Sequence, residues 1–589
     1  MMHIQMIKNL KRHCRTAKLL QRSMSFPPAL WQRTFMVTYT ALRNRMGICL
    51  LLLMGSGCFP NLLAQTQVNV PLPKFKKDTL SILQLGAVSD GFTLNTTAIN
   101  RTIDQLSNKG GGVVAIPPGL WLTGPIELKS NINLYLSPSA TLLFSADFNH
   151  YRLQKVSWEG VDQMRNQAPI YAIGATNIAI TGKGVIDGNG DAWRMVKKEK
   201  LTETQWKKKV SSGGLLSDDK KTWYPTASSL LGSTVQNPGV VTDQKDASFY
   251  QSVKDFLRPN LVVLEKCSTV LLEGVTFQNS PAWCLHPLMS RNISVKNVLV
   301  KNPWYAQNGD GIDVESCDGV LIENSIFDVG DDALCMKSGR DEAGRKRNMP
   351  TQNVTIRNCL VYAAHGGFVI GSEMSGGVKN ISVSKCTFIG TDIGLRFKSA
   401  RGRGGVVENI HISDIYMKDI VGEAILFDMY YMAKDPIPTA GEQRELPAIE
   451  AKPFNETTPI FKNFTIQNVQ CAGAETAVFI RGLPEAPIQQ ITFSNMNFQS
   501  NKGIEIQEAS QCSFSNVRVS SKNTNPLIHI VQGSRLNFEK IQFNKGAQLL
   551  CLVSGDRSNQ IIFTNTLNQA AEKSFSTISG ATPQSILFK

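Results

Sequence analysis

One short phrase, a polar residue followed by alternating apolar residues, recurs along the chain and limits the folds open to it. It reads NIAITGKGVI from residue 177, NISVKNVLV from 292, NVTIRNCLV from 353 and NISVSKCTF from 380, with further copies from 268, 318, 409, 463, 490 and 534. Most neighbouring copies are roughly 22 to 33 residues apart, which is the period of stacked repeats. Alternation of this kind is typical of a strand with one buried face.

A second family of strand-like segments lies between the copies of that phrase. Four of them read NGDGIDVES (308–316), GDDALCMKS (330–338), HGGFVIGS (365–372) and DIGLRFKS (392–399), and shorter ones begin at 424, 477, 503 and 527. Two or three strands per turn at this period predict an all-β chain folded as a right-handed parallel β-helix. A propeller would need longer units with hairpins, and a leucine-rich repeat would show leucine at fixed offsets.

The repeat predicts a single β-helix domain over residues 82–589 with a short helical cap at its amino-terminal end. Residues Asn95 to Ser107 place Ala98, Ile99, Ile103 and Leu106 on one side of a helix that ends at three glycines. A stack without such a cap would expose a sheet edge and an apolar interior.

Two segments, 194–257 and 430–458, interrupt the rhythm and are expected to be loops inserted into single coils. The first contains the lysine runs KKEK (197–200) and KKK (207–209). Runs of this kind are usually solvated surface. The functional alternative is a basic wall that narrows a cleft and attracts an acidic substrate.

The first 64 residues indicate export. Arg43 and Arg45 precede the apolar run ICLLLLMG (48–55), and small residues then lead to Ala64. This pattern is typical of a secretory signal peptide behind an upstream extension, and it predicts a periplasmic or extracellular protein without stable membrane insertion after processing. A single-span anchor with a basic tail is the alternative, and Ser56-Gly57-Cys58 leaves lipoprotein processing open.

Charge and cysteine usage exclude several classes of partner. The formal charge is +15, but residues 1–45 contribute nine Lys/Arg and no Asp/Glu, so about +6 remains without them, and this demands no nucleic acid. Twelve cysteines fall to nine after residue 64, and no CxxC pair occurs, which favours neither a zinc site nor a disulfide scaffold. The sequence implies no metal or cofactor, and we expect a monomer.

Carboxylates and cations gather in the four segments between 308 and 399. Their apolar residues align in pairs two positions apart, namely Ile312/Val314, Leu334/Met336, Phe368/Ile370 and Leu395/Phe397. In that frame Asp310 and Asp332 share one position at the strand entrance, and Asp331 and His365 share the position before it. If the strands stack in register, these groups crowd together.

Three acids on neighbouring coils are the strongest chemical signal in the chain. Parallel strands lie about 4.8 Å apart, so Asp310 and the Asp331-Asp332 pair would be within direct electrostatic reach. Like charges so close raise one another's affinity for protons, which keeps one acid protonated while another stays ionised. An acid and a base side by side are what hydrolysis of a glycosidic bond needs.

Arg396 and Lys398 are two residues apart and alternate with the apolar pair of the last segment. A structural role would require acidic partners for both cations. The functional interpretation is that they hold a substrate carboxylate together, which points to a uronic acid rather than a neutral sugar. His365, before Gly366-Gly367, could orient or tune one of the acids, or it could be a turn residue.

These motifs resemble a known family. Asn308-Gly309-Asp310, Gly330-Asp331-Asp332, His365-Gly366 and Arg396-Phe397-Lys398 are similar, in order and spacing, to the N-x-D, G/Q-D-D, G-H-G and R-I-K signature of the polygalacturonase-type glycoside hydrolases, family 28. The resemblance extends over roughly Ile82 to Tyr431. Its departures, Ala364 before the histidine, Gly309 in the variable position and Phe397 for isoleucine, remove no reacting group.

The resemblance implies a role for each residue. Asp331 would protonate the glycosidic oxygen, Asp310 with Asp332 would activate water, and His365 would support the acid. Arg396 and Lys398 would bind the galacturonate carboxylate. The remaining substrate-binding positions are Asn308, Gly366 and Tyr430, with Tyr431 as the alternative tyrosine.

The stereochemical outcome implied by the resemblance conflicts with the expected spacing of the carboxyl groups. The family implies inversion, whereas carboxyls about 5 Å apart are usual for retention and inverting enzymes have roughly 6.5–9.5 Å. We expect inversion, because two acids that flank one water can activate it without attacking the sugar.

The segment 257–267, the insertion 194–257 and the run NPWYAQNGDGIDVESC resemble the exo-acting bacterial branch of the family. We therefore expect release of terminal α-linked galacturonic acid from pectic oligo- or polysaccharides. An endo-polygalacturonase or a rhamnogalacturonan hydrolase is the alternative. A pectate-lyase-like enzyme, which would need calcium, and a non-catalytic carbohydrate-binding β-helix are further readings.

Overall fold

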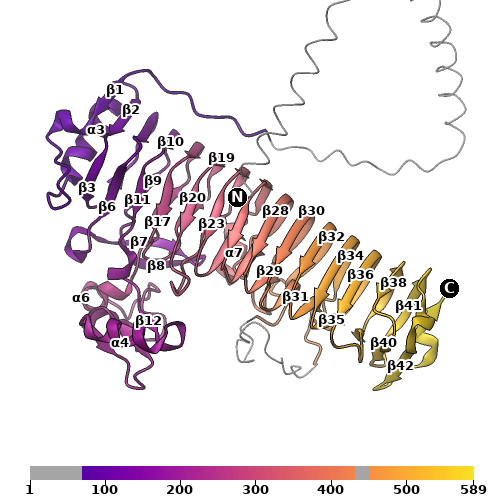
Figure 1. Cartoon of the computed structure of the whole chain (residues 1–589). Coiled ribbons are helices and arrows are strands. Elements are labelled where there is room, and N and C mark those ends of the chain that lie inside the picture. The colour runs from indigo at the N-terminus through magenta and orange to yellow at the C-terminus, as the bar shows by residue number, and fades with distance from the viewer. Residues whose placement is uncertain (1–68, 432–449) are drawn as a thin grey trace, which may run out of the picture. The chain divides into compact units, whose positions relative to one another are not determined.

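Short parallel strands follow one another from Thr79 to Phe588 and stack coil upon coil (Figure 1). The structure is a computed structural model that describes residues 69–431 and 450–589. These residues belong to one unit, Gln67–Lys589, which contains the predicted domain. The expected signal peptide and most of the segment 430–458 lie outside the described residues.

The sheet that carries the candidate site has 14 strands. They are β4 (Ile126–Glu127), β9 (Ile170–Ile173), β15 (Val262–Glu265), β18 (Leu285–Leu288), β21 (Ile312–Glu315), β24 (Asp332–Lys337), β27 (Gly366–Ile370), β29 (Ile393–Lys398), β31 (Glu423–Asp428), β33 (Thr476–Arg481), β35 (Lys502–Gln507), β37 (Ile528–Val531), β40 (Ala547–Ser554) and β42 (Ala571–Ile578). Each strand pairs in parallel with the equivalent strand of the next coil. We call this sheet the site sheet.

The second sheet has 24 strands and covers the rest of each coil. One column contains β1 (Thr79–Ser81), β2 (Gly112–Ile116), β5 (Ile132–Leu136), β10 (Thr176–Gly182), β16 (Ser268–Glu273), β19 (Arg291–Lys296), β22 (Asp318–Glu323) and β25 (Thr351–Arg357). The column beside it contains β3 (Gly119–Thr123), β6 (Ala140–Phe144), β11 (Val185–Asp187), β17 (Thr276–Gln278), β20 (Leu299–Lys301), β23 (Ile326–Asp328) and β26 (Leu360–Tyr362).

Later coils merge these two columns into long strands. They are β28 (Val378–Ile389), β30 (Val406–Lys418), β32 (Ile460–Ala472), β34 (Ile488–Ser500) and β36 (Ala509–Ser521), followed by β38 (Ser534–Glu539), β39 (Gln542–Phe543), β41 (Asn559–Thr564) and β43 (Ile586–Phe588). The two or three strands per turn match the expectation. The all-β parallel β-helix is therefore confirmed, right-handed as parallel crossovers almost always are.

The asparagine that opens the recurring phrase has a structural reason. Asn353, Asn380, Asn409 and Asn463 all have a φ between 56° and 58°, a left-handed conformation that asparagine tolerates better than other side chains. Each donates its side-chain amide to the residue one coil earlier, as from Asn380 to Asn353 at 3.2 Å and from Asn409 to Asn380 at 3.1 Å. The ladder holds the corner of successive coils in register.

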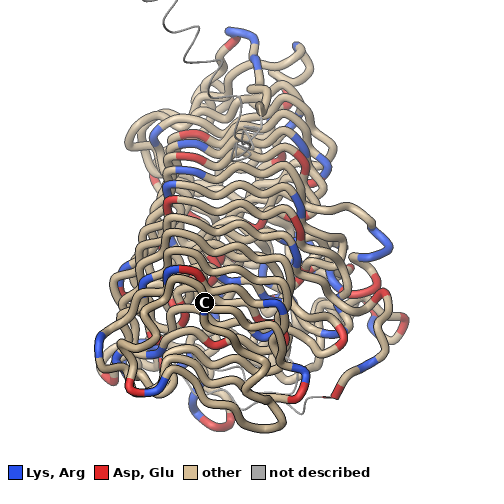
Figure 2. The backbone as a smooth tube through the Cα atoms, turned by 90° about the vertical axis from the view of Figure 1, so that its right-hand side faces the viewer, with Lys and Arg blue, Asp and Glu red and all other residues tan. Residues whose placement is uncertain are grey.

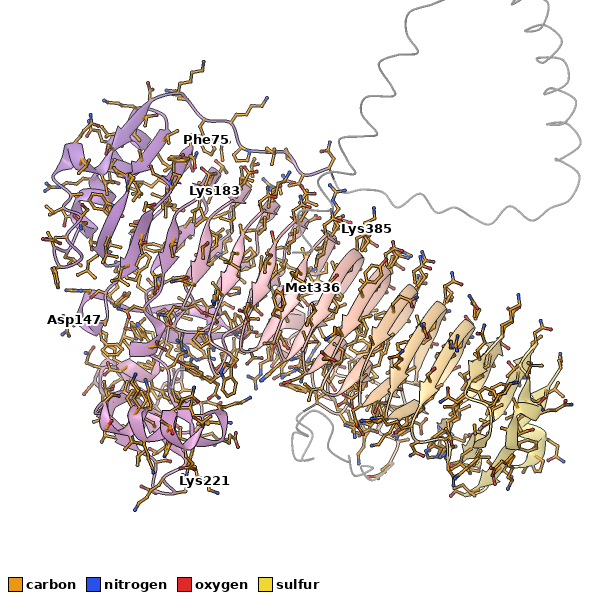
Figure 3. The ribbon with its side chains drawn as sticks, in the orientation of Figure 1. Phe75, Asp147, Lys183, Lys221, Met336 and Lys385 are labelled. Atoms are coloured by element: carbon orange, nitrogen blue, oxygen red, sulfur yellow. The ribbon has the colours of Figure 1, made fainter. Side chains whose placement is uncertain are left out.

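Apolar side chains from both sheets fill the inside of the coils. Met336 is fully buried, whereas Lys183 and Lys385 extend outward from the coils (Figure 3). Toward the carboxyl end the core is a stack of phenylalanine rings, with centroids 4.5 Å apart for Phe493 and Phe514 and 4.9 Å for Phe514 and Phe538. Equivalent residues repeat at this spacing because each coil adds one strand separation. The nine described cysteines are buried and free, as the sequence predicts.

Helix α3 (Thr96–Asn108) forms the expected cap. Its residues Ile99, Ile103 and Leu106 are buried in the same core as the strands. The predicted boundaries, Asn95 to Ser107, differ by one residue at each end. The cap covers the apolar interior that the first coil would otherwise leave open.

The insertion 194–257 is not a plain loop. It contains β12 (Val196–Lys197), α4 (Glu203–Ser211), β13 (Leu215–Leu216), β14 (Thr222–Tyr224), α5 (Ala227–Ser233) and α6 (Ala247–Ser252). Val196, Trp206 and Trp223 form a small core of their own. Apolar residues at these positions, spaced too widely for one periodic pattern, therefore build a folded appendage. Lys207 and Lys208 are exposed, as expected for a solvated lysine run.

A hairpin that the sequence did not predict lies beside the insertion. It consists of β7 (Leu153–Trp158) and β8 (Val161–Asn166), which pair in antiparallel fashion. Helix α7 (Asp341–Arg347) follows β24. Arg347 donates to the Ser157 hydroxyl at 2.8 Å, so the hairpin contacts residues 190 positions later in the chain.

Charged residues of both signs alternate along the outside of the coils (Figure 2).

Among the described residues, no helix is both long enough and apolar enough to cross a membrane.

We expect Phe538→Ala to lower the free energy of unfolding by about 3–5 kcal/mol, because it leaves a cavity in a closely packed ring stack. Thermal or denaturant unfolding followed by circular dichroism measures the change. Phe92→Ala is the matched control, since Phe92 is 87% exposed, and it should leave stability nearly unchanged. Equal effects of the two substitutions would contradict the packing described here.

Candidate active site

The turns that enter β21, β24, β27 and β29 bring the predicted acids together. Ile312 pairs with Leu334, Leu334 with Phe368, and Phe368 with Leu395, which is the predicted register. Asp310, Asp331 and Asp332 consequently present carboxylate oxygens that all lie within 4.8 Å of one another. Asp310 and Asp332 are buried, whereas the Asp331 side chain is 20% exposed.

Backbone contacts fix these turns. The amide of Gly311 donates to the Asp332 carbonyl at 2.9 Å, and the amide of His365 donates to the Asp331 carbonyl at 3.0 Å. Asn308 has a φ of 54°, and its backbone N–H donates to Asp331 Oδ2 at 3.2 Å. A Cβ on Gly330 would lie 2.5 Å from the Pro303 carbonyl oxygen, which explains the glycine before the two aspartates.

Asp332 pairs with both predicted cations. Lys398 Nζ lies 2.6 Å from Asp332 Oδ2, and Arg396 Nη1 lies 3.1 Å from Asp332 Oδ1. The sequence argument assumed that a structural role would require acidic partners for both cations. The structure supplies one shared carboxylate, so the trio keeps one positive charge in excess. The same two cations also act on Asp331, whose pKa they lower.

Gly366 makes room for this trio rather than offering a side chain to a ligand. A Cβ there would overlap a methyl group of Val369 and would come within 3.3 Å of both Arg396 Cδ and Asp332 Oδ1. The His365-Gly366 motif therefore combines a functional side chain with a position that must stay small.

His365 lies between two carboxylates. Its Nδ1 is 3.3 Å from Asp331 Oδ1, and its Nε2 is 3.6 Å from Asp392 Oδ2. The His365 and Asp392 side chains are 35% and 39% exposed, so this end of the cluster faces solvent. The sequence argument singled out His365 but not Asp392, although Asp392 opens the quoted segment DIGLRFKS.

The environment drives the acids in opposite directions. Burial, followed by the negative charges of Asp313 and Asp331, raises the pKa of Asp310 well above its usual value. Burial also opposes ionisation of Asp331, but His365, Lys398 and Arg396 outweigh it and lower the pKa of that carboxyl. Lys398 and Arg396 likewise overcome burial to lower the pKa of Asp332. Without a ligand, Asp310 is therefore the member that favours the protonated form.

The pKa of His365 is raised. Burial lowers it, but the charge of Asp331, a hydrogen bond to Asp331 and the charge of Asp392 raise it more, against a smaller lowering by Arg396. The imidazolium form is therefore stabilised between the two carboxylates.

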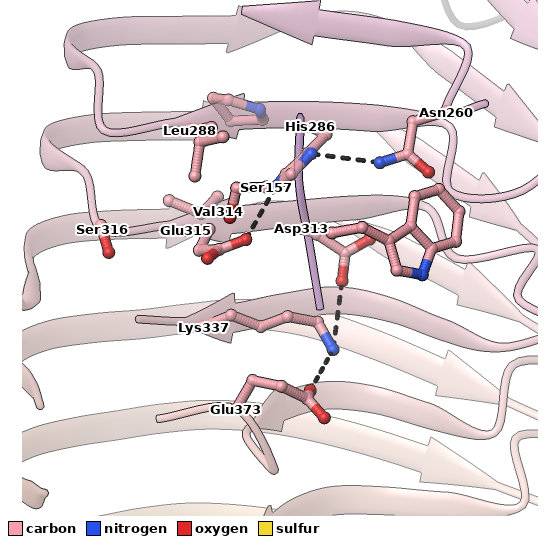
Figure 4. A network of polar contacts seen from close by, with 12 residues as sticks. Ser157, Asn260, His286, Leu288, Asp313, Val314, Glu315, Ser316, Lys337 and Glu373 are labelled. Carbon is pink, nitrogen blue, oxygen red and sulfur yellow. Dashed lines mark hydrogen bonds and ion pairs between the residues drawn. The ribbon is translucent and has the colours of Figure 1, made fainter. Parts of the chain in front are cut away.

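A second buried polar network joins β18, β21 and β24 (Figure 4). Lys337 is 2.9 Å from Glu373 and 3.6 Å from Asp313, and its ammonium lies over the Trp283 ring. His286 Nε2 is 3.0 Å from Glu315 Oε2. Asp313 is three residues after Asp310, so its charge adds to the electrostatic cost of ionising Asp310.

Arg258 is a positioning residue that the sequence argument did not name, although it lies in the quoted segment 257–267. It donates to the Asn308 side-chain oxygen at 2.9 Å and to the Gln307 and Pro281 carbonyls, each at 2.9 Å. These bonds hold the turn that carries Asp310. Asn308, predicted to bind substrate, is thus bound to Arg258 through its side chain.

The tyrosine prediction needs a correction. Tyr431 has its ring beside Lys398 and Arg396, at 4.9 and 5.8 Å from the ring centroid. Tyr430 is buried and its ring faces Arg401 and Arg481 instead. Because consecutive residues of an extended chain point in opposite directions, one of the two had to face away from the site, and that residue is Tyr430.

The three aspartates are near enough to share a metal ion, but Arg396 and Lys398 already supply the balancing cations to Asp332. Carboxylates of different proton affinity beside a pair of cations are an arrangement that suits acid–base chemistry.

Comparisons with known proteins agree with this chemistry. The model of the glycosyl hydrolases family 28 matches residues 229–521. The exo-poly-alpha-D-galacturonosidase of Dickeya chrysanthemi is 28% identical, over 77% of this chain and 72% of that protein. The endo-polygalacturonase of Pectobacterium carotovorum subsp. carotovorum is also 28% identical, over 58% of this chain and 74% of its own. A hyperthermoactive exopolygalacturonase from Thermotoga maritima is 29% identical and has a TM-score of 0.60, covering 81% of this chain and 94% of that one.

We expect Lys398→Met to lower the free energy of unfolding by about 3 kcal/mol at pH 7, because Asp332 loses a buried partner. The pKa of Asp332 is lowered in the wild type and rises in the variant. Asp332 therefore stabilises the wild type above the unfolded pKa of aspartate, 3.8, and this contribution is lost as the pH falls below that value through the folded pKa. The difference between the proteins should therefore be smaller at about pH 3 than at pH 7. Unfolding curves at several pH values measure it.

Lys418→Met is the matched control, because Lys418 and its partner Asp419 are 64% and 65% exposed. It should change the free energy of unfolding by less than about 1 kcal/mol. A pH-independent effect of Lys398→Met would contradict the pairing with Asp332.

Proposed function

Starting from a chain that is a glycoside hydrolase resembling the family 28 polygalacturonases, we propose that it hydrolyses terminal α-linked galacturonic acid from pectic oligo- or polysaccharides. The observation that carries this proposal is the joint placement of three carboxylates and the Arg396–Lys398 pair. The acids lie within 4.8 Å of one another, and one of them contacts both cations. A glycosidic bond and a sugar carboxylate can therefore be held at one place.

In this mechanism Asp331 gives its proton to the glycosidic oxygen as the bond to the leaving sugar breaks. Asp310 and Asp332 activate the attacking water, and Asp332, the ionised member, takes its proton. The water oxygen bonds to the anomeric carbon. Asp331 suits the donor role because its carboxyl is more accessible than those of Asp310 and Asp332.

The low pKa of Asp331 without substrate is compatible with this role. Lys398 and Arg396 are two of the charges that lower it. A galacturonate carboxylate bound to them would neutralise their effect and raise the pKa of Asp331, which favours the protonated form needed for donation. Substrate binding would thus prepare the acid.

The proposal includes inversion of the anomeric configuration, because the chain resembles the family. The carboxylate oxygens lie within 4.8 Å, a separation nearer to the usual value for retention. Three acids offer a different arrangement from the usual pair, since Asp310 and Asp332 can flank one water. The anomeric configuration of the first product, read by proton NMR, distinguishes the two outcomes.

An exo mode is supported by a wall on the amino-terminal side of the acids. Trp158 of the hairpin β7–β8 stacks on Trp283 with centroids 5.5 Å apart, and Ser157 accepts a hydrogen bond from Arg347. At the tip of the hairpin, Gly160 lies so close to the backbone of Arg340 that a Cβ would collide with it. The hairpin therefore packs against Trp283, in the turn before β18, and against Arg340 and Arg347 beyond β24, and in this proposal it blocks a polymer from running through the site.

The alternative is an endo mode, and an endo-acting relative is as similar in identity as the exo-acting one. Hydrolysis of a rhamnose-alternating pectin is the other alternative. The wall formed by Trp158 and Trp283 favours the exo mode, because an endo-acting enzyme must admit the chain on both sides of the acids.

Incubation with polygalacturonate should release small terminal products from the start, while the length of the polymer falls slowly. High-performance anion-exchange chromatography of early time points measures this. A ladder of mixed oligomers without small terminal products would reject the exo mode while leaving hydrolysis in place. A product that absorbs in the ultraviolet, as an unsaturated uronate does, would reject hydrolysis.

Replacing Asp331 by asparagine should lower kcat about 10²- to 10⁴-fold with little change in KM, because the proton donor is lost while the shape is kept. Initial rates on a defined galacturonate oligomer measure it. Asp318→Asn is the control, since Asp318 is exposed on β22 of the other sheet. Wild-type turnover in a folded Asp331→Asn protein would reject the donor role.

A further inference from the structure

Asp392 has a position that the proposed mechanism does not use. It lies at the entrance to β29, the strand that also carries Arg396 and Lys398. Its amide donates to the Ala364 carbonyl at 2.8 Å, and the next amide, of Ile393, donates to the His365 carbonyl at 3.2 Å. The backbone therefore fixes Asp392 one coil above His365, in the same turn.

The side chains of this turn form a row across three coils. Asp331 faces His365 Nδ1 at 3.3 Å, and Asp392 faces His365 Nε2 at 3.6 Å. The charged groups around the imidazole are thus Asp331 at the entrance to β24, Asp392 at the entrance to β29, and Arg396 on β29. A neutral imidazole has one N–H, so it can donate to only one of the two carboxylates, whereas the imidazolium can donate to both.

We propose that Asp392 is a positioning residue for the hydrolysis: it holds His365 as an imidazolium with Nδ1 toward Asp331, so that His365 can give a proton to Asp331 when substrate binds. The inference rests on the proposed function. It gives Asp392 no contact with the reacting atoms.

The proton balance of this step is complete. Asp331 loses its proton to the leaving glycosidic oxygen and becomes a carboxylate. When the next substrate binds, the proton on His365 Nδ1 moves to Asp331; the neutral imidazole keeps its Nε2–H beside Asp392 and takes a new proton from solvent at Nδ1. Asp332 releases the proton taken from water to solvent, so no proton is gained or lost by the enzyme over one cycle.

The geometry fits a relay rather than a buried structural pair. His365 and Asp392 are more than one third exposed, so solvent protons can reach the imidazole. The distances of 3.3 and 3.6 Å are those of ion pairs slightly longer than good hydrogen bonds. Catalytic hydrogen bonds in ligand-free structures are often long and tighten with substrate.

The test compares Asp392→Asn with the wild type across pH. Activity that needs protonated His365 is present below the pKa of His365 and is lost as the pH rises through it. Asparagine removes one negative charge, so the pKa of His365 falls and the alkaline limb of kcat moves to lower pH, by about one unit. KM at pH values below that limb should stay within about twofold, since Asp392 touches no substrate.

Two further variants separate positioning from a general effect of charge or folding. Asp392→Glu keeps the carboxylate and should restore most of the wild-type pH profile. Asp419→Asn removes an equal charge from an exposed turn one coil further on, where Asp419 pairs with Lys418, and it should leave the alkaline limb unchanged. An equal shift in Asp419→Asn, or no rescue by Asp392→Glu, would overturn the proposal.

A titration without substrate keeps this test independent of the proposed function. The chain has seven histidines, and the His365 resonance is assigned as the one missing in His365→Gln. Its pKa, followed by NMR, should be lower in Asp392→Asn than in the wild type. An unchanged pKa overturns the positioning role, even where hydrolysis of galacturonan is observed. A lowered pKa in a protein without hydrolase activity supports the positioning and rejects the proposed function instead.

Discussion

The site depends on the parallel register of β21, β24, β27 and β29. Ile312, Leu334, Phe368 and Leu395 occupy equivalent inward positions on successive coils, and each is fully buried. A slip of one residue would turn each of these side chains outward and move Arg396 and Lys398 into the core. The apolar interior therefore fixes the positions of polar groups that contribute nothing to it.

The same register brings together charges that would otherwise repel one another. Burial opposes ionisation at each acid, and the structure offsets this differently along the row. Asp332 pairs with two cations, and Asp331 faces His365. The largest charge effects on the pKa of Asp310 come instead from two other acids, Asp313 and Asp331. Three identical side chains thus acquire different proton affinities from their neighbours alone, which is the requirement for an acid and a base to work side by side.

Local patterns in the sequence predicted the features that repeat along the helix. The alternating apolar residues, the helical cap and the shared positions of Asp310 with Asp332 all follow from periods that are visible in the chain. The sequence left Tyr430 and Tyr431 as alternatives, because which of them faces Arg396 and Lys398 depends on how the chain leaves β31. The hairpin β7–β8 was not predicted, because its partner Arg347 is 190 residues away in the sequence and no repeat period links the two segments.

For a related reason, the sequence did not single out Asp392. An aspartate before a strand is usually a turn residue, and its charge gains meaning only when the previous coil places a histidine beneath it. His365 and Asp392 are separated by one full coil, so their pairing is a consequence of stacking and not of local sequence. In the proposed mechanism, protons enter at the solvent-facing end of the row, Asp392 and His365, and the substrate anion binds at the buried end, beside Asp332 and its cations. Because Arg396 and Lys398 also lower the pKa of Asp331, an anion bound there alters the acid that must act on it. A neutral sugar would leave Asp331 ionised, and discrimination in favour of uronic acids would then arise in the chemical step as well as in binding.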